Sequence, residues 1–162
     1  MESEINLNGI AIRSCSSRIA PAELIEKLKK YRGRNLAVQL FDYGSTINRT
    51  HILGAYLNAI LAFKNNKNIS NSISMEMLLF ASMTRQISEA IGKIGIRSND
   101  SFVFFSNSRP AYADFKKLLE KDCEFKTTKS HEAAAAKKFG IATDTDYSKA
   151  VLQEMAVTRL ED

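Results

Sequence analysis

The sequence has few of the residues that build disulfide-rich, metal-stabilised or membrane-spanning folds. It contains two prolines, no tryptophan and only two cysteines, Cys15 and Cys123, too few and too far apart for a disulfide framework or a zinc site. No apolar run approaches the roughly 20 residues that a bilayer span needs. The N-terminus, MESEINLNGI, is acidic and lacks the apolar segment of a secretory signal. These absences predict a cytoplasmic protein with no membrane contact.

Recognisable catalytic motifs are also missing. The seven glycines are isolated and form neither a dinucleotide-binding nor a P-loop pattern. His51 and His131 have no metal-binding spacing, and we expect His51 on the surface or in a supporting role at the start of a helix. Cys15 has no identifiable base, and Glu76 and Glu89 are typical of solvated or ion-paired glutamates on amphipathic helices. The sequence therefore predicts no enzyme, no cofactor and no metal site.

What the chain does have is the composition of a globular protein. Its 162 residues are 44% hydrophobic and 25% charged, which predicts a single domain over 1–162 with a real core. The hydrophobic periodicity predicts an α/β fold, in which a small central mixed sheet of three to four strands is covered by about seven helices. The opening strand–helix–strand pattern is compatible with a right-handed parallel crossover. The expected strands are 4–14, 36–41, 101–106 and 123–128, and the expected helices are 21–31, 49–64, 72–82, 85–96, 109–121, 132–139 and 143–160.

Positive charge is concentrated in the first hundred residues. The formal net charge is +5, and residues 13–34 alone carry seven basic and two acidic side chains. Such an excess is compatible with a nucleic-acid-binding face, and equally with a solvated, lysine-rich helix surface. Composition leaves both interpretations open.

The most informative segment joins two short helices near Met83 and Thr84. Arg85 and Gln86 follow, at the expected start of a helix that Thr84 would cap. A basic residue there opposes the helix macrodipole, so an anion or a partner's acceptor group would be favourable nearby. The alternative is internal pairing of Arg85 with Glu89, four residues on, or with Glu76 across the junction.

The surroundings of Arg85 extend this hypothesis. The pattern of the second helix predicts a core-facing stripe made of Ile87, Ala90, Ile91 and Ile94. Lys93 is eight residues from Arg85, about two helical turns, so both side chains can point the same way. Three further basic residues are expected to add to the same surface, namely Arg49, Lys64 and Lys67.

The expected terminal helix carries an apolar stripe of Tyr147, Val151, Leu152, Met155 and Leu160. The stripe either packs on the sheet or serves as a docking surface for a protein partner. Its first turn shows Thr143 and Asp146 three residues apart, which resembles a capping box.

One family has a similar pattern. The helix HILGAYLNAILAF, followed by NISNSISMEMLLFASMTRQISEAIGKIGI, resembles the PRPK-binding (TPRKB-like) subunit of the KEOPS/EKC complex, in its archaeal type. The matching positions are Ser70–Asn71, Glu76, Arg85–Gln86–Ile87, Ala90–Ile91 and Gly95, and LAVQLFDYG before them is also similar. The similarity is most specific over residues 36–96.

The resemblance implies a non-catalytic accessory subunit. KEOPS installs a threonylcarbamoyl group on adenosine in tRNA, and its transferase subunit, an indirect partner, performs the chemistry. The direct partner would be the complex's small atypical kinase/ATPase, and the family is implicated in holding tRNA by its 3′ CCA end. The alternative is a module that regulates the kinase without contacting RNA.

The resemblance and the charge pattern together select candidate residues. Phe41 and Tyr43 are candidate stacking platforms for tRNA bases, or simply core residues. The tRNA-binding candidates are Asn71, Arg85, Gln86, Lys93, Arg49, Lys64 and Lys67, and the kinase-contact candidates are Val151, Leu152, Met155 and Leu160.

Overall fold

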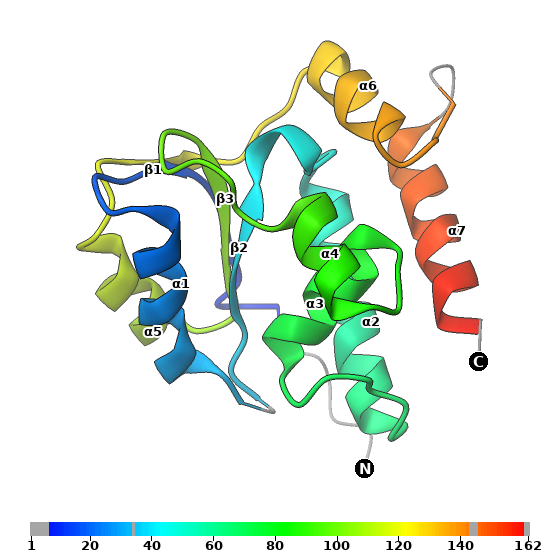
Figure 1. Cartoon of the computed structure of the whole chain (residues 1–162), viewed down its shortest axis with the longest axis horizontal. Helices are drawn as coiled ribbons and strands as arrows, with labels where there is room; N and C mark the ends of the chain where they lie inside the picture. Colours follow the sequence, from blue (N-terminus) through cyan, green and yellow to red (C-terminus); the bar gives the residue numbers. More distant parts are fainter. Residues whose placement is uncertain (1–6, 34, 143–145, 161–162) are drawn as a thin grey trace.

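A four-stranded antiparallel sheet forms the centre of the molecule in the computed structural model, which describes residues 7–33, 35–142 and 146–160 (Figure 1). The strands are β1 (Ala11–Ser16), β2 (Val38–Asp42), β3 (Phe102–Ser106) and β4 (Lys121–Glu124), in the order β2-β3-β1-β4. All paired strands are antiparallel. Strands β1 and β2 run in the same direction but are not neighbours, because β3 lies between them. The mixed α/β class is confirmed, whereas the expected mixed sheet is wrong, because no parallel pair forms among the strands that the structure describes.

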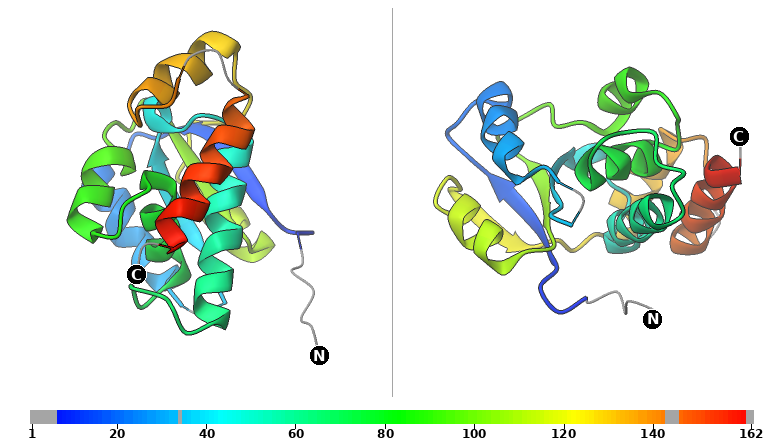
Figure 2. Two further views of the ribbon diagram at one scale, coloured as in Figure 1. Left: turned by 90° about the vertical axis from the view of Figure 1, so that its right-hand side faces the viewer. Right: turned by 90° about the horizontal axis from the view of Figure 1, so that it is seen from below.

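Helices cover both faces of this sheet (Figure 2). One face packs against α1 (Pro21–Leu28) and α5 (Arg109–Lys116), and the other against α2 (Arg49–Lys64) and α3 (Ile73–Ser82). The all-buried strand β3 serves both cores, since Phe102 and Phe104 face α1 and α5 while Val103 and Phe105 face α2. The remaining helices are α4 (Ile87–Ile94), α6 (Lys129–Lys137) and α7 (Tyr147–Leu160).

The sheet edges are closed in two ways. Along β2, the Val38 N–H donates to Ser74 Oγ at 3.1 Å and the Leu40 N–H to Gln39 Oε1 at 2.9 Å, so side chains take up backbone groups that another strand would pair with. The opposite edge strand, β4, has only four residues and three of them are charged. Both devices discourage edge-to-edge association.

Helix α2 is the central helix, as its apolar sequence predicts. Asn48 caps it by accepting the His51 N–H at 3.1 Å. His51 is fully buried, contrary to the expected surface position, because its ring bridges two backbone groups. The Ile47 N–H donates to His51 Nδ1 at 3.0 Å, and His51 Nε2 donates to the Ala81 carbonyl oxygen at 2.7 Å. The ring thereby ties the start of α2 to the end of α3.

Several element boundaries differ from the expected ones. Leu7 is 50% exposed before β1, which begins at Ala11 rather than near residue 4. Helix α5 ends at Lys116, and β4 therefore begins at Lys121, earlier than the expected 123–128. Thr143 of the expected capping box lies outside the described residues. Within the described part of the chain, no helix is long and apolar enough to cross a membrane.

Candidate binding site at the end of helix α2

A pocket lies where the C-terminal end of α2 meets the following loop, α3 and the end of α7. One wall is apolar, whereas Lys67 and Arg85 supply two positive charges. The lining residues are Leu61, Ala62, Asn65, Lys67, Ile69, Glu76, Leu79, Phe80, Thr84, Arg85 and Thr158. An apolar wall with a few polar and cationic groups is the usual composition of a ligand-binding pocket.

Glu76 holds the loop that forms one side of the pocket. Its side chain is only 2% exposed. The carboxylate accepts the Ile69 N–H at 3.1 Å, the Ser70 N–H at 2.9 Å and the Ser70 hydroxyl at 2.7 Å. Hydrogen bonds to an ionised acceptor are stronger than neutral ones, so these contacts fix the loop against α3.

The loop leaves α2 through a tight turn. Asn66 adopts a left-handed backbone conformation with φ 55°, and the Lys67 N–H donates to the Ala62 carbonyl oxygen at 2.8 Å. Ser72 then caps α3 by accepting the Met75 N–H at 3.3 Å. The turn brings Lys67 to the pocket, and the Ser72 cap confirms one of the two predicted caps for this helix.

Arg85 reaches the pocket because α3 ends abruptly. Met83 is left-handed with φ 59°, and the Thr84 N–H donates to the Leu79 carbonyl oxygen at 3.2 Å. Arg85 then lies in a bend, and the extended Gln86 is the N-cap of α4, which begins at Ile87. The predicted start of the helix at Arg85 is therefore wrong, and the argument from the helix macrodipole does not apply to this residue.

Thr84 has a different role from the predicted cap. Its hydroxyl accepts the Gln86 N–H at 3.3 Å and donates to Glu89 at 3.0 Å. Glu89 also pairs with Lys93 at 3.1 Å. The hydrogen bond from Lys93, and to a smaller extent the one from Thr84, holds the pKa of Glu89 below its usual value. Lys93 is thus paired on its own helix.

The expected core-facing stripe of α4 is only half correct. Ala90 and Ile94 are buried, but Ile87 and Ile91 are 38% and 50% exposed. The buried face of α4 therefore contains only Ala90 and Ile94 of the four predicted residues.

Two of the seven predicted tRNA-binding residues line the pocket. Lys67 and Arg85 line the pocket, and Lys64 is exposed at the last residue of α2. Asn71 and Gln86 are exposed in the segments that flank α3. Two candidates lie elsewhere: Lys93 is paired on α4, and Arg49 is at the opposite end of the 16-residue α2, about 24 Å away.

The predicted stacking platforms do not belong to this pocket. Phe41 is fully buried in the core, and the Tyr43 ring packs on His131 with centroids 4.7 Å apart. The apolar wall is made instead of Leu61, Ile69 and Phe80. Leu61 is an apolar residue near the end of a helix and Ile69 is an apolar residue in a polar loop, so the sequence offers some indication that they could form such a wall. Nothing in the sequence indicates that Thr158 reaches the site.

The kinase-contact candidates divide by exposure. Val151 and Met155 are fully buried, so for them the packing alternative is correct, although α2 and not the sheet covers them. Leu152 is 41% exposed. The side chain of Leu160 lies outside the described residues.

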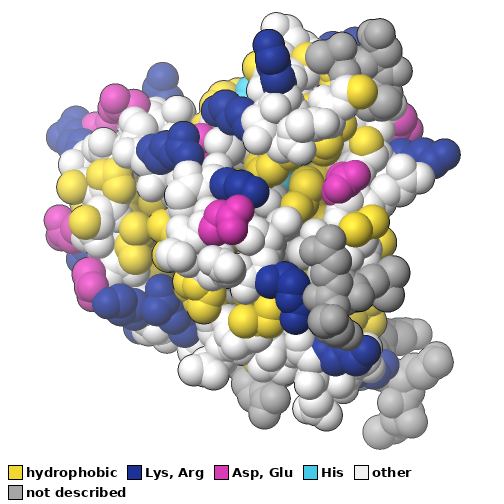
Figure 3. Space-filling model, turned by 45° about the vertical axis from the view of Figure 1, so that its right-hand side comes forward, with side chains coloured by type: hydrophobic (Ala, Val, Ile, Leu, Met, Phe, Trp, Pro, Cys, Tyr) yellow, Lys and Arg dark blue, Asp and Glu magenta, His cyan; other side chains and the backbone are white. Residues whose placement is uncertain are grey.

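The face over α3, α4 and α7 shows Lys and Arg side chains next to exposed hydrophobic ones (Figure 3). In the described part of the chain, no three His, Cys, Asp or Glu side chains come together as a metal site.

Comparison with known proteins assigns the chain to a family. No individually curated protein matches the chain. A family profile described as "Kinase binding protein CGI-121" matches residues 19–159, which is most of the sequence and includes every residue of the pocket. The chain therefore belongs to the CGI-121 family of kinase-binding proteins.

Proposed function

We propose that the chain is a non-catalytic accessory subunit of a KEOPS-type tRNA-modification complex. In this role it binds the small atypical kinase/ATPase directly, contacts the transferase subunit only indirectly, and holds substrate tRNA by its 3′ CCA tail. Membership of a kinase-binding family supports the first part. The pocket that joins Lys67 and Arg85 to an apolar wall is the observation that carries the RNA part.

The pocket has the chemistry that a single-stranded tail requires. Guanidinium and ammonium groups bind the phosphates, and splayed bases pack on apolar or aromatic side chains. Asn65, in the lining, and Asn71 and Gln86, beside it, can each donate and accept hydrogen bonds at base edges. Stacking of a base on an aromatic ring contributes about 1–3 kcal/mol, and Phe80 is the aromatic residue of the pocket lining.

Binding of intact tRNA and of tRNA lacking CCA tests this proposal. We expect intact tRNA to bind the wild-type protein about tenfold or more tighter, because a contact worth about 1.4 kcal/mol changes affinity tenfold. Arg85→Glu should remove that difference. The matched control is Arg18→Glu, a highly exposed arginine between β1 and α1 that does not line the pocket, and this variant should preserve the difference. Equal affinity of both RNAs for the wild type would contradict tail binding.

The kinase is expected on the α2–α7 side of the molecule. Helix α2 is apolar all round, which is typical of a helix that is covered on every side. Leu53 and Leu57 nevertheless remain partly exposed on it, and Leu152 of α7 is 41% exposed. Hydrophobic surface of this kind marks protein-interaction sites.

A pair of matched substitutions separates docking from general surface effects. Leu152→Arg should weaken kinase binding at least tenfold, whereas Ile25→Arg, at a 37% exposed position of α1 across the sheet, should not. If both variants bind the kinase like the wild type, the docking surface is elsewhere. Kinase binding that stays intact while neither tRNA is bound would favour the alternative, a regulatory module without RNA contact.

A further inference from the structure

A second positively charged site lies at the other end of α2. A shallow groove runs beside the beginning of β1, and three arginines from three different elements line it: Arg13 of β1, Arg49 of α2 and Arg109 of α5. Its other lining residues are Leu7, Asn8, Gly9, Ile10, Ala11, Ile12, Tyr112 and Glu124.

Two of these arginines occupy unfavourable positions. Arg49 is the first residue of α2, and Arg109 is the first residue of α5. Positive charge at the first turn of a helix opposes the macrodipole, by typically about 0.3–1 kcal/mol. Both side chains are exposed, and neither has an ion-pair partner among the residues that the structure describes. An anion in the groove would compensate both charges.

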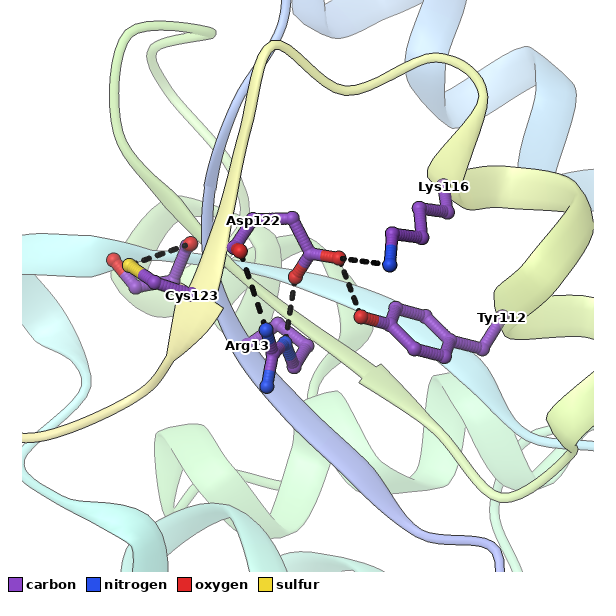
Figure 4. Close-up of polar contacts among 6 residues, drawn as sticks. Arg13, Tyr112, Lys116, Asp122 and Cys123 are labelled. Atoms are coloured by element: carbon purple, nitrogen blue, oxygen red, sulfur yellow. Dashed lines mark hydrogen bonds and ion pairs between the residues drawn. The ribbon is translucent and has the colours of Figure 1, made fainter.

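The third arginine is held in a fixed orientation. Arg13 Nε donates to Asp122 Oδ1 at 2.6 Å, and the same carboxylate accepts a hydrogen bond from Tyr112 (Figure 4). Glu124 is the acidic residue among the lining residues, and its Oε2 lies 3.6 Å from Lys126 Nζ. The acidic groups at the groove are therefore already paired, and Arg49 and Arg109 leave an excess of positive charge.

Gly9 packs beside the aliphatic part of Arg109 in this groove. A Cβ atom on Gly9 would lie 3.8 Å from Arg109 Cγ and 3.4 Å from the Asn107 carbonyl oxygen, which are ordinary contact distances.

We propose that this groove binds the sugar–phosphate backbone of RNA, as a second contact to the body of the tRNA whose tail occupies the α2 pocket. The inference rests on the proposed function for the identity of the RNA. Guanidinium groups bind phosphate bidentately and without regard to sequence, which suits contact with a duplex region. Arg49 of the groove is the first residue of α2, and the pocket lies at the last turn of this 16-residue helix, so about 24 Å of helix separates the two, a span that one RNA molecule covers.

The test uses tRNA that lacks its 3′ CCA, so that the tail pocket does not contribute. The variant Arg49→Glu/Arg109→Glu should bind this RNA about tenfold or more weaker at low salt. Its slope of log K against log[salt] should be smaller by about 1.4–1.8, because two phosphate contacts are lost. Arg18→Glu, the control, should leave both quantities unchanged.

Weaker RNA binding by the double variant should not be caused by unfolding. Glutamate is favourable at the first turn of a helix, so the double variant should melt no lower than the wild type. Wild-type affinity and salt slope in the double variant would overturn the proposal. So would unchanged RNA binding with weakened kinase binding, which would assign the groove to an acidic protein surface. If Arg85→Glu fails to affect intact tRNA while the double variant loses tailless tRNA, only the tail-binding proposal falls.

Discussion

At the scale of single residues, Glu76 sets the shape of the candidate site. Its buried carboxylate accepts hydrogen bonds from the backbone of Ile69 and Ser70, so one side chain of α3 determines where the pocket loop lies. The sequence shows only an acidic residue in the first turn of a helix. The reach of that residue back to the preceding loop depends on tertiary structure and is not visible in the pattern.

Glu76→Gln should loosen this loop, because the amide presents an N–H group to backbone N–H donors. We expect the protein to lose about 1–3 kcal/mol of stability and the Ile69 and Ser70 amides to exchange faster with solvent. Hydrogen exchange followed by mass spectrometry measures the second effect. Glu120→Gln, at an exposed glutamate beyond α5, is the control. Unchanged exchange at residues 69 and 70 would contradict this role.

His51 makes stability depend on pH. Burial lowers its pKa to about 4, whereas the unfolded chain has a value near 6.5. The folded state keeps the ring neutral because Nδ1 accepts the Ile47 N–H, so between these two values the unfolded state binds more protons. Stability from this group is therefore complete above pH 6.5 and falls as the pH drops toward 4.

Urea unfolding at pH 7 and pH 5 measures this effect against a variant without a titrating ring, His51→Gln. The wild type should lose roughly 2 kcal/mol more than the variant over this interval, since one pKa unit corresponds to about 1.4 kcal/mol. Equal losses in the two proteins would show that His51 does not titrate differently in the folded state.

At the scale of elements, the close packing of α7 on α2 determines which surface α7 leaves exposed. A Cβ atom on Gly54 would lie 2.6 Å from Leu152 Cδ2 and 3.4 Å from Met155 Sδ, so a larger residue at this position would force these α7 side chains to move. Val151 and Met155 are fully buried in this contact. Removing α7 would therefore expose core residues, and a point substitution at Leu152 is the cleaner test of kinase docking.

Gly54→Ala tests the contact, because two effects of known size oppose each other. Alanine improves helix propensity by about 1 kcal/mol, while overpacking costs about 1–3 kcal/mol, so we expect a net loss of stability. Gly92→Ala, on the open face of α4, has no atom within 4 Å of the new Cβ and should be stabilising. In a Leu152→Ala background, Gly54→Ala should instead increase stability, because the close contact is gone. An increase in stability from Gly54→Ala in the wild-type background would contradict the close contact.

Periodicity predicts the presence and type of these elements well, and their ends less well. Apolar runs and caps identify α2, β3 and the Ser72 start of α3, because local sequence alone specifies them. The break after α3 is different, since the left-handed Met83 is a conformation that a non-glycine residue adopts only in a particular tertiary context. The predicted start of α4 at Arg85 is wrong because of that break.

At the scale of the whole molecule, the candidate site combines parts that are far apart in the chain. Arg85, Gln86 and Asn71 were predicted from one segment, and the fold places them around the end of α2. Thr158 of α7 also lines this pocket, whereas Arg49 lies at the opposite end of α2, in the groove. The order of the strands and the packing of α7 decide these positions, and neither is encoded in a local pattern.

Crosslinking of intact tRNA to the protein, with a photoreactive nucleotide in the CCA tail, tests the central claim most directly. The account predicts crosslinks within residues 61–71 and 84–87, and their loss in Arg85→Glu but not in Arg18→Glu. Crosslinks from the tail that map elsewhere on the chain, or that persist unchanged in Arg85→Glu, would contradict it.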